Sequence, residues 1–189
     1  MGPNDFRARL AAALDPEPAP EPAPGDQLAG VLVPVVEGQE RSVVFTRRTE
    51  RLSRHAGQIS FPGGLQHGGD GSLVATALRE TEEEIGLSPM AVDILGALAP
   101  VHTFVSGVLI VPFVGVLAAR PAFVPNSSEV AEVLEYPLAR LAEAETKVEF
   151  PRDGRFHRGF AYEMDGNTIW GATAAILHEL IALVRDIAG

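Results

Sequence analysis

The strongest constraint on the fold is a helix that carries three glutamates and is bounded by glycine-rich turns. At about 100° per residue, Glu80, Glu83 and Glu84 fall within roughly 100° of one another on a single face of this helix. The apolar residues Val74 and Ile85 cluster on a different face. The pattern therefore predicts a helix that buries one side against a core and presents three carboxylates together on the other.

The three carboxylates repel one another, because like charges four positions apart on a helix are destabilising. A cation bound between them would remove this conflict. No histidine or cysteine stands near them in the helix, and the chain contains no cysteine at all. Oxygen-only ligands favour a hard ion, so the helix predicts a Mg²⁺ or Mn²⁺ site rather than a zinc site.

Glycines and capping residues mark both ends of the helix. Gly63-Gly64 and Gly68-Gly69 form a loop before it, and Asp70 and Ser72 are candidate N-caps. Gly86 stands where a C-cap glycine belongs. The chain therefore runs from a strand through a glycine loop and an acidic helix to a glycine stop.

This order resembles the Nudix box. The box pattern is Gly, five residues, Glu, seven residues, and then Arg-Glu-apolar-x-Glu-Glu-x-Gly-apolar. Its C-terminal half matches at Arg79, Glu80, Glu83, Glu84, Gly86 and Leu87, with Thr81 at the usual apolar position. In the N-terminal half Asp70 replaces the Glu, and eight residues rather than seven separate it from Arg79. Whether Asp70 is a metal ligand therefore stays open.

The resemblance implies a Nudix-type α/β/α sandwich with a mixed central sheet, and a metal-dependent pyrophosphohydrolase. It implies Glu80 and Glu84 as the first metal ligands, with Glu83 assisting. It gives catalytic roles to these three glutamates and to Arg79. We expect Arg79 to hold a glutamate in place rather than to bind substrate.

The composition argues against a nucleic-acid-binding, membrane-spanning or secreted protein. The net charge of −10 leaves no basic excess to neutralise nucleic-acid phosphates, so we expect no nucleic-acid partner. No apolar run reaches the roughly 18 residues of a membrane span, so we expect no membrane partner. The N-terminus lacks the apolar core of a secretory signal, and without cysteine no disulfide forms. These features together predict a cytoplasmic enzyme.

The rest of the chain consists of short predicted strands and helices. Residues 15–26 alternate proline with other residues, which favours an extended segment. We divide the chain into an N-terminal segment, 1–27, and a Nudix hydrolase domain, 28–189. The predicted strands are 28–36, 42–46, 58–61, 91–97, 109–117, 147–150, 160–164 and 168–170, and the predicted helices besides the acidic one are 4–14, 129–134, 137–142 and 171–187. A mixed sheet flanked by the acidic helix and the last helix makes an α/β/α sandwich.

A basic segment precedes the glycine loop. Four arginines lie within residues 47–54 of a chain whose net charge is −10. Taken alone, such a segment is more often an exposed loop whose arginines pair with surface acids. Because it leads directly into the strand before Gly63, we expect its charges at the mouth of the metal site. Arginine is well suited there to bidentate phosphate contacts.

The same segment resembles the extra motif of the coenzyme A pyrophosphatase branch of the Nudix family. That motif runs Leu-Leu-Thr-x-Arg-Ser, a few residues, an optional Arg, and then Gly-x-x-x-Phe-Pro-Gly-Gly. Residues 44–49 fill the first part, Gly57 and residues 61–64 fill the last, and Ser53 stands at the optional Arg. The resemblance implies coenzyme A or a derivative as the small-molecule nucleotide substrate. The residues that we expect to contact it are Arg48, Arg51, His55, Gly63 and Gly64.

Several alternatives stay open at this point. The substrate could be another nucleoside diphosphate derivative, such as ADP-ribose or a dinucleotide polyphosphate. The chain could instead be a non-catalytic module that senses a nucleotide, although the presence of all three glutamates argues against it. The general base could be a glutamate of the box, or an acid outside it such as Glu129 or Glu132. An edge strand or the proline-rich segment could support a homodimer.

Overall fold

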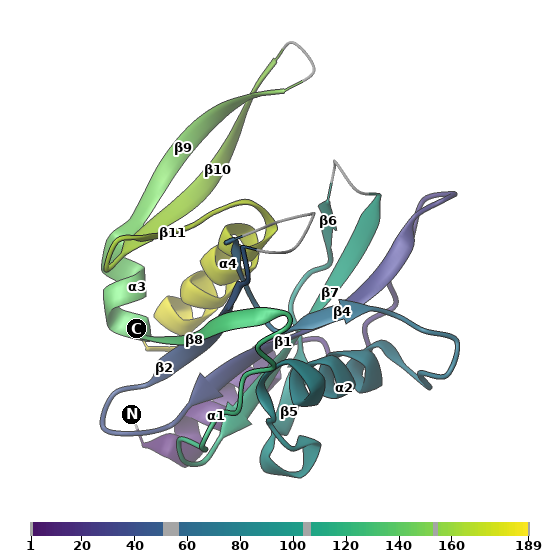
Figure 1. Cartoon of the computed structure of the whole chain (residues 1–189). Coiled ribbons are helices and arrows are strands. Elements are labelled where there is room, and N and C mark those ends of the chain that lie inside the picture. Colours follow the sequence, from purple (N-terminus) through teal and green to yellow (C-terminus); the bar gives the residue numbers. More distant parts are fainter. Residues whose placement is uncertain (1, 51–56, 104–106, 153–154, 189) are drawn as a thin grey trace.

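The computed structural model describes residues 2–50, 57–103, 107–152 and 155–188. The elements follow one another as α1 (Pro3–Ala13), β1 (Gln27–Val36), β2 (Ser42–Arg48), β3 (Ile59–Ser60), β4 (Gly63–Leu65), α2 (Leu73–Ile85), η1 (Pro89–Ala91), β5 (Asp93–Ala97), β6 (Val101–Thr103), β7 (Val108–Leu117), β8 (Val130–Pro137), α3 (Leu138–Ala144), β9 (Glu145–Arg152), β10 (Arg155–Met164), β11 (Asn167–Ile169) and α4 (Gly171–Ala188). Figure 1 shows helices packed around a twisted sheet, and a separate sheet of β9, β10 and β11 from which β9 and β10 project together.

The main sheet is mixed and is built around β1. Along one edge, β1 pairs in parallel with β7 over its whole length, from Gln27↔Val108 to Val36↔Leu117. Along the other edge it pairs antiparallel with β4 through Ala29–Val31 and with β2 at its C-terminal end. The strand order is β3-β2-β1-β7-β5, with β4, β6 and β8 pairing with β1, β7 and β2. The glycine strand β4 is thus fixed to the central strand of the sheet.

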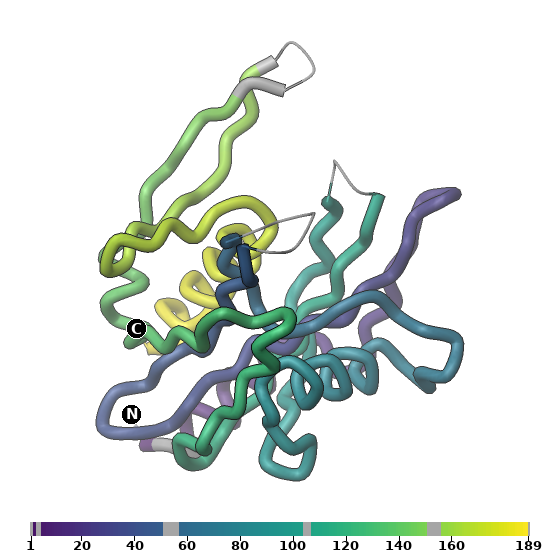
Figure 2. Tube along the Cα trace, viewed as in Figure 1, coloured from purple at the N-terminus to yellow at the C-terminus, as the bar shows by residue number. Residues whose placement is uncertain are grey.

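Helices cover both faces of this sheet, because successive side chains of a strand point to opposite faces. Val33 of β1 belongs to the core cluster that includes residues of α1 and α4. Its neighbours Leu32 and Val36 belong to the cluster that includes Ala77 of α2. Figure 2 shows the same arrangement, with α2 separated from α1 and α4 by the strands. The predicted α/β/α sandwich with a mixed sheet is confirmed.

The N-terminal helix is part of this core. α1 lies where a helix was expected over residues 4–14, and its Phe6 and Leu10 are completely buried in the cluster that contains α4. Beyond α1, Asp15 forms an antiparallel bridge with Ala97 of β5. The division at residue 27 stays a prediction. No helix of the described residues is long and apolar enough to cross a membrane.

One predicted helix is wrong. The sequence pattern indicated a helix over 129–134, whereas Val130–Pro137 is strand β8. β8 pairs antiparallel with β2, in a register that sets Leu134 opposite Phe45. Leu134 and Tyr136 enter the core on the α4 side, two residues apart, as a strand requires. Pairing with the open edge of β2 therefore overrides the helix propensity of Ala, Glu and Leu in this segment.

The strands predicted over 147–150 and 160–164 are both longer in the structure. β9 and β10 pair antiparallel from Glu145↔Tyr162 outward to Arg152↔Arg155. β11 adds a third strand only beside Tyr162–Met164, at the base of this sheet. The outer part of β9 and β10 is therefore a two-stranded ribbon (Figure 1).

Candidate active site

The acidic helix α2 is capped at both ends by the residues that the sequence marks. The Ser72 hydroxyl accepts a hydrogen bond from the backbone N–H of Ala75 at 3.2 Å, which satisfies one free donor of the first turn. Gly86 ends the helix in the left-handed conformation at φ 67°. Of the two candidate N-caps, Ser72 takes this position, and Asp70 has a different role.

A close contact with β1 fixes α2 against the sheet. A Cβ at Gly30 would lie 2.2 Å from the carbonyl oxygen of Leu73, in the first turn of α2. Real Cβ atoms do not approach backbone oxygens so closely, so only glycine permits this spacing. The helix axis is therefore held near β1, and through β1 near the glycines of β4, which pair with Gly30 and Val31.

The three glutamates of α2 differ widely in exposure. Glu84 is only 5% exposed, whereas the side chains of Glu80 and Glu83 are 16% and 59% exposed. The expectation that all three lie together on the solvent side is therefore wrong for Glu84. The helix turns so that Ala77, Thr81 and Glu84 share its buried side, where Ala77 and Thr81 are small enough for close approach to the sheet.

Glu84 lies at the meeting point of three segments. Its Oε2 accepts a hydrogen bond from the Gly63 backbone N–H at 3.3 Å. Its Oε1 is 3.8 Å from a guanidinium nitrogen of Arg48, the last residue of β2. Burial raises the pKa of Glu84 to about 7, with the charges of Glu80 and Glu129 adding to the effect, although the Gly63 N–H and Arg48 oppose it. Glu84 is thus a buried carboxylate whose partners, the Gly63 N–H and Arg48, do not fully offset the effect of burial on its pKa.

The two box glycines leave room for these carboxylates. A Cβ at Gly64 would lie 2.5 Å from the carboxyl carbon of Glu80. Gly63 has φ +148° and would place a Cβ 2.5 Å from the carbonyl oxygen of Gly30. Glu80 and Glu84 therefore flank the start of β4, each against one glycine.

Arg79 and Asp70 form an ion pair beside the glutamates. The Arg79 Nε and Nη2 donate to the two carboxylate oxygens of Asp70 at 2.9 and 3.0 Å. Nη1 of the same guanidinium is 2.9 Å from Glu80 and 3.2 Å from Glu83. These contacts raise the pKa of Arg79, and the paired guanidinium holds the pKa of Asp70 far below its usual range.

The one-residue insertion in the box does not displace Asp70 from this pair. Its Oδ2 also accepts hydrogen bonds from the Thr76 hydroxyl and the His67 backbone N–H, both at 2.9 Å. Both carboxylate oxygens of Asp70 are thus occupied by the protein, which leaves it the role of orienting Arg79. In the sequence, the spacing of six residues from Gly64 marked Asp70 as a residue of the box. It did not indicate that Asp70 would pair with Arg79.

The predicted substrate contacts are only partly described by the structure. Arg51 and His55 lie outside the described residues. Arg48 is described, and it is directed at Glu84. Of the two candidate bases outside the box, Glu132 is ion-paired with Arg47 at 2.6 Å, whereas the charge of Glu129 acts on Glu84. The structure thus brings Arg48 and Glu129 to the box and directs Glu132 elsewhere.

The donors at this site suit a hard divalent cation. Glu80 and Glu84 offer only carboxylate oxygens, which are the ligands that a hard divalent ion prefers. Among the described residues, no three acidic or histidine side chains converge closely enough to coordinate an ion as they stand. Glu80 is instead ion-paired with Arg79 at 2.9 Å.

Comparison with known proteins agrees with this geometry. The NUDIX domain profile matches residues 26–158. The chain is 39% identical over 186 residues to an uncharacterized Nudix hydrolase, NudL, from Pectobacterium atrosepticum, across 97% of this chain and 95% of that protein. A NudL protein from Photorhabdus laumondii is 36% identical over 96% of this chain and 97% of its own length.

A solved structure shares the fold at low sequence identity. The NUDIX hydrolase from Alicyclobacillus acidocaldarius aligns with a TM-score of 0.59 over 87% of this chain and 96% of that chain, at 17% identity. These matches agree with the geometry of the site, in which the capped acidic helix α2 packs against the glycine strand β4. The chain belongs to the NUDIX domain family and is a Nudix hydrolase.

Proposed function

We propose that this protein hydrolyses the pyrophosphate bond of coenzyme A and its derivatives, giving 3′,5′-ADP and 4′-phosphopantetheine products. The observation that carries the proposal is the position of Arg48. This residue belongs to the motif upstream of the box, and its guanidinium lies 3.8 Å from the buried Glu84 of the box. The two sequence motifs are therefore parts of a single site.

The proposed cofactor is Mg²⁺ or Mn²⁺. Glu80 and Glu84 would hold it, with Glu83 assisting. When bound, such an ion neutralises pyrophosphate charge, lowers the pKa of a water molecule and orients it for attack. The oxygen-only donor set supports this choice of ion.

The chain's own residues supply the remaining functions. Asp70 holds Arg79 through two hydrogen bonds, and Arg79 in turn holds Glu80 and Glu83 in position. Gly63 and Gly64 would let the phosphates approach the β4 backbone, where a Cβ has no space. Positioning of this kind is a major source of rate in an in-line displacement at phosphorus.

A glutamate of the box is one candidate for the general base, and of the two acids outside the box we favour Glu129 over Glu132. The backbone N–H of Glu129 donates to Asn126, whose own N–H donates to the carbonyl oxygen of Glu84, so Glu129 lies close to the box. Glu132 is ion-paired with Arg47. A general base must lie within hydrogen-bond reach of the attacking water, directly or through one further water.

One alternative substrate has a specific observation in its favour. The NUDIX domain of Shewanella oneidensis NrtR, solved in complex with ADP ribose, aligns over 100% of both chains with a TM-score of 0.55 at 18% identity. ADP-ribose shares the adenosine diphosphate part of coenzyme A but lacks its 3′-phosphate. The arginines upstream of the box favour coenzyme A, because a further phosphate needs a further cation.

A substrate panel tests the proposal. The purified protein is incubated with Mg²⁺ or Mn²⁺ and with coenzyme A, dephospho-coenzyme A, ADP-ribose or diadenosine polyphosphates, and the products are separated by chromatography. We expect preferential release of 3′,5′-ADP from coenzyme A. Preferential cleavage of ADP-ribose would reject the substrate and keep the hydrolase chemistry. Failure to cleave any of them would favour a nucleotide-sensing module.

Paired variants test the individual roles. Glu80→Gln should lower kcat by orders of magnitude while the fold is retained, and full activity would reject the metal assignment. Arg48→Ala should raise the KM for coenzyme A more than the KM for dephospho-coenzyme A. The matched control is Arg47→Ala, the neighbouring arginine of β2, which is engaged by Glu132. An equal change for both substrates in Arg48→Ala would reject a contact with the 3′-phosphate.

A further inference from the structure

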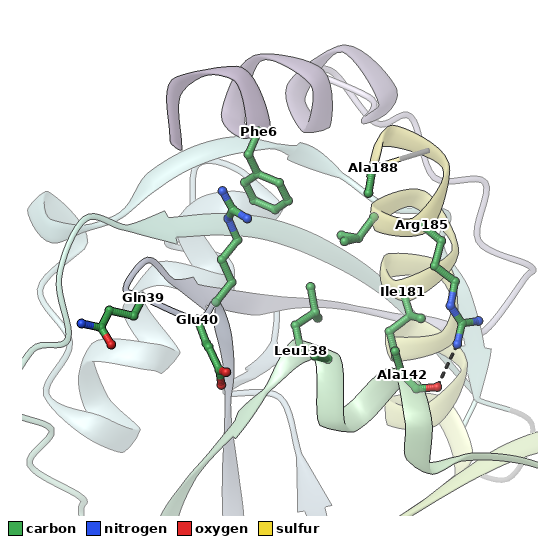
Figure 3. Close-up of a pocket in the computed structure, with 11 residues that line it drawn as sticks. Phe6, Gln39, Glu40, Leu138, Ala142, Ile181, Arg185 and Ala188 are labelled. Atoms are coloured by element: carbon green, nitrogen blue, oxygen red, sulfur yellow. Dashed lines mark hydrogen bonds between the residues drawn. The ribbon is translucent and has the colours of Figure 1, made fainter. Parts of the chain in front are cut away.

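A hollow in the protein surface lies on the face of the sheet opposite to α2. Its volume is about 310 Å³, within the lower range of small-molecule sites. It is enclosed by α1, the turn between β1 and β2, α3 and the C-terminal half of α4 (Figure 3). The apolar residues of α2, the helix that carries the box glutamates, pack in the other core cluster, so this hollow is separate from the candidate active site.

The floor of the hollow is apolar. Phe6 of α1, Leu138 of α3 and Ile181 of α4 converge on it from three sides, but they are buried and form its base beneath the accessible surface (Figure 3). Ala142 and Val184 complete the lining between the helices. An aliphatic chain of a ligand would gain about 0.8 kcal/mol for each methylene buried against such a surface.

Arg41 places an uncompensated positive charge at the edge of this floor. Its guanidinium lies 3.9 Å from the centre of the Phe6 ring. Its Nε is buried and has no hydrogen-bond partner, and no carboxylate within the described ranges is at ion-pair distance from it. A buried donor on a charged group is costly when it is unsatisfied, so this guanidinium is suited to an anionic partner.

The other arginine at the hollow is already occupied. Arg185 donates from Nη2 to the carbonyl oxygen of Ala142 at 2.8 Å, which joins α4 to α3 (Figure 3). Its Nη1 is 3.7 Å from Glu145. Glu40 also lines the hollow, but its side chain is exposed to solvent. The contrast between Arg41 and Arg185 identifies the end of the hollow at which an anion would be held.

We propose that this hollow binds an amphiphilic carboxylate, with its alkyl chain along the apolar floor and its carboxylate on Arg41. A guanidinium pairs with a carboxylate through two parallel N–H···O bonds, and the Phe6 ring beneath holds its plane. The chain chemistry follows from the half-buried Ala142 and Val184, which form the accessible apolar lining, and the volume suits a short or medium chain. The proposal does not depend on the substrate of the active site.

Calorimetric titration with alkanoates of increasing length tests this assignment on the full chain. Hexanoate, octanoate and decanoate are compared with octanol, which lacks the charge, and octylammonium, which reverses it. We expect affinity to rise by about fourfold for each added methylene until the hollow is filled. We expect octanol to bind at least about tenfold more weakly than octanoate, because it cannot form the charged pair.

Two variants test separately the charge of Arg41 and the volume of the hollow. Arg41→Gln should weaken octanoate binding by at least about tenfold and leave octanol binding unchanged. Ala142→Phe keeps Arg41 but fills the floor, and it should abolish binding of both. Arg158→Gln, a change at an 89% exposed arginine on β10, is the matched control and should bind octanoate as the wild type does.

The results that overturn the proposal are equally specific. They are the absence of any alkanoate binding at millimolar concentration, octylammonium binding as well as octanoate, or wild-type binding by both Arg41→Gln and Ala142→Phe. Because the readout is binding at a site remote from α2, an inactive active site would not affect the result. Thermal unfolding of each variant shows whether a loss of binding is a loss of fold.

Discussion

The buried carboxylate of Glu84 should make the metal-free protein less stable as the pH rises. Its pKa is 4.5 in the unfolded chain and about 7 in the folded protein, because burial disfavours the charged form. Between these two values the folded state binds more protons than the unfolded state, so the free energy of unfolding falls with pH. The difference between the two pKa values corresponds to about 3 kcal/mol of unfolding free energy. This stability is lost by the time the pH exceeds the pKa of the folded protein.

Glu84→Gln isolates this contribution. Glutamine has the shape of the protonated glutamate, can still accept from the Gly63 N–H, and does not ionise. In a chelator, the variant and the wild type should be about equally stable below pH 4.5. Above pH 7 the variant should be more stable by about 3 kcal/mol, or roughly 6–12 °C in Tm for a chain of this size.

The assay is urea unfolding across this pH range, with Glu82→Gln as the matched control. Glu82 lies on the same helix with an exposed side chain, so its removal should not change the slope of stability against pH. Added Mg²⁺ should stabilise the wild type above pH 7 and should stabilise Glu84→Gln much less. Parallel pH profiles for Glu84→Gln and the wild type would refute the argument that the burial of Glu84 outweighs its contacts with Gly63 and Arg48.

Three further substitutions probe the framework of the site. Gly64→Ala should push the Glu80 carboxylate away and lower kcat by about a hundredfold in steady-state kinetics, with the fold retained by circular dichroism. Wild-type kinetics in this variant would contradict the close contact between Gly64 and Glu80. Gly30→Ala should cost about 3 kcal/mol of unfolding free energy, because its Cβ meets a backbone carbonyl of α2, and unchanged urea unfolding would reject this contact. Asp70→Asn should lower kcat by about 10- to 100-fold, because the asparagine holds Arg79 less firmly. A calorimetric titration should still show metal binding by this variant. Loss of metal binding would instead make Asp70 a metal ligand.

Much of the fold was accessible from local patterns. Caps and glycines fixed both ends of α2, because helix termini and left-handed turns depend on residues close in sequence. The long apolar runs of β1 and β7 read correctly as buried strands. The segment at β8 could not be read in this way, because the edge of β2 that it joins is more than 80 residues away in the chain.

The geometry of the site likewise could not be predicted from local sequence alone. The spacing on α2 placed Glu80, Glu83 and Glu84 on one face, but their exposure depends on how the helix is rotated against β1. That rotation is set by the contact at Gly30, a residue outside the box. The link between Arg48 and Glu84 likewise arises because β2 and α2 meet only in the folded protein.

The parallel pairing of β1 with β7 has a consequence for synthesis on the ribosome. Each residue of β1 finds its partner in β7 about 80 positions later in the chain, and the residues of α4 that cover its Val33 side come later still. Meanwhile α2 emerges with its buried side, including Glu84, facing an unfinished sheet. We therefore expect nascent chains that lack α4 to expose the apolar side of β1 that carries Val33 and to engage chaperones, and chains that include α4 to be released from them.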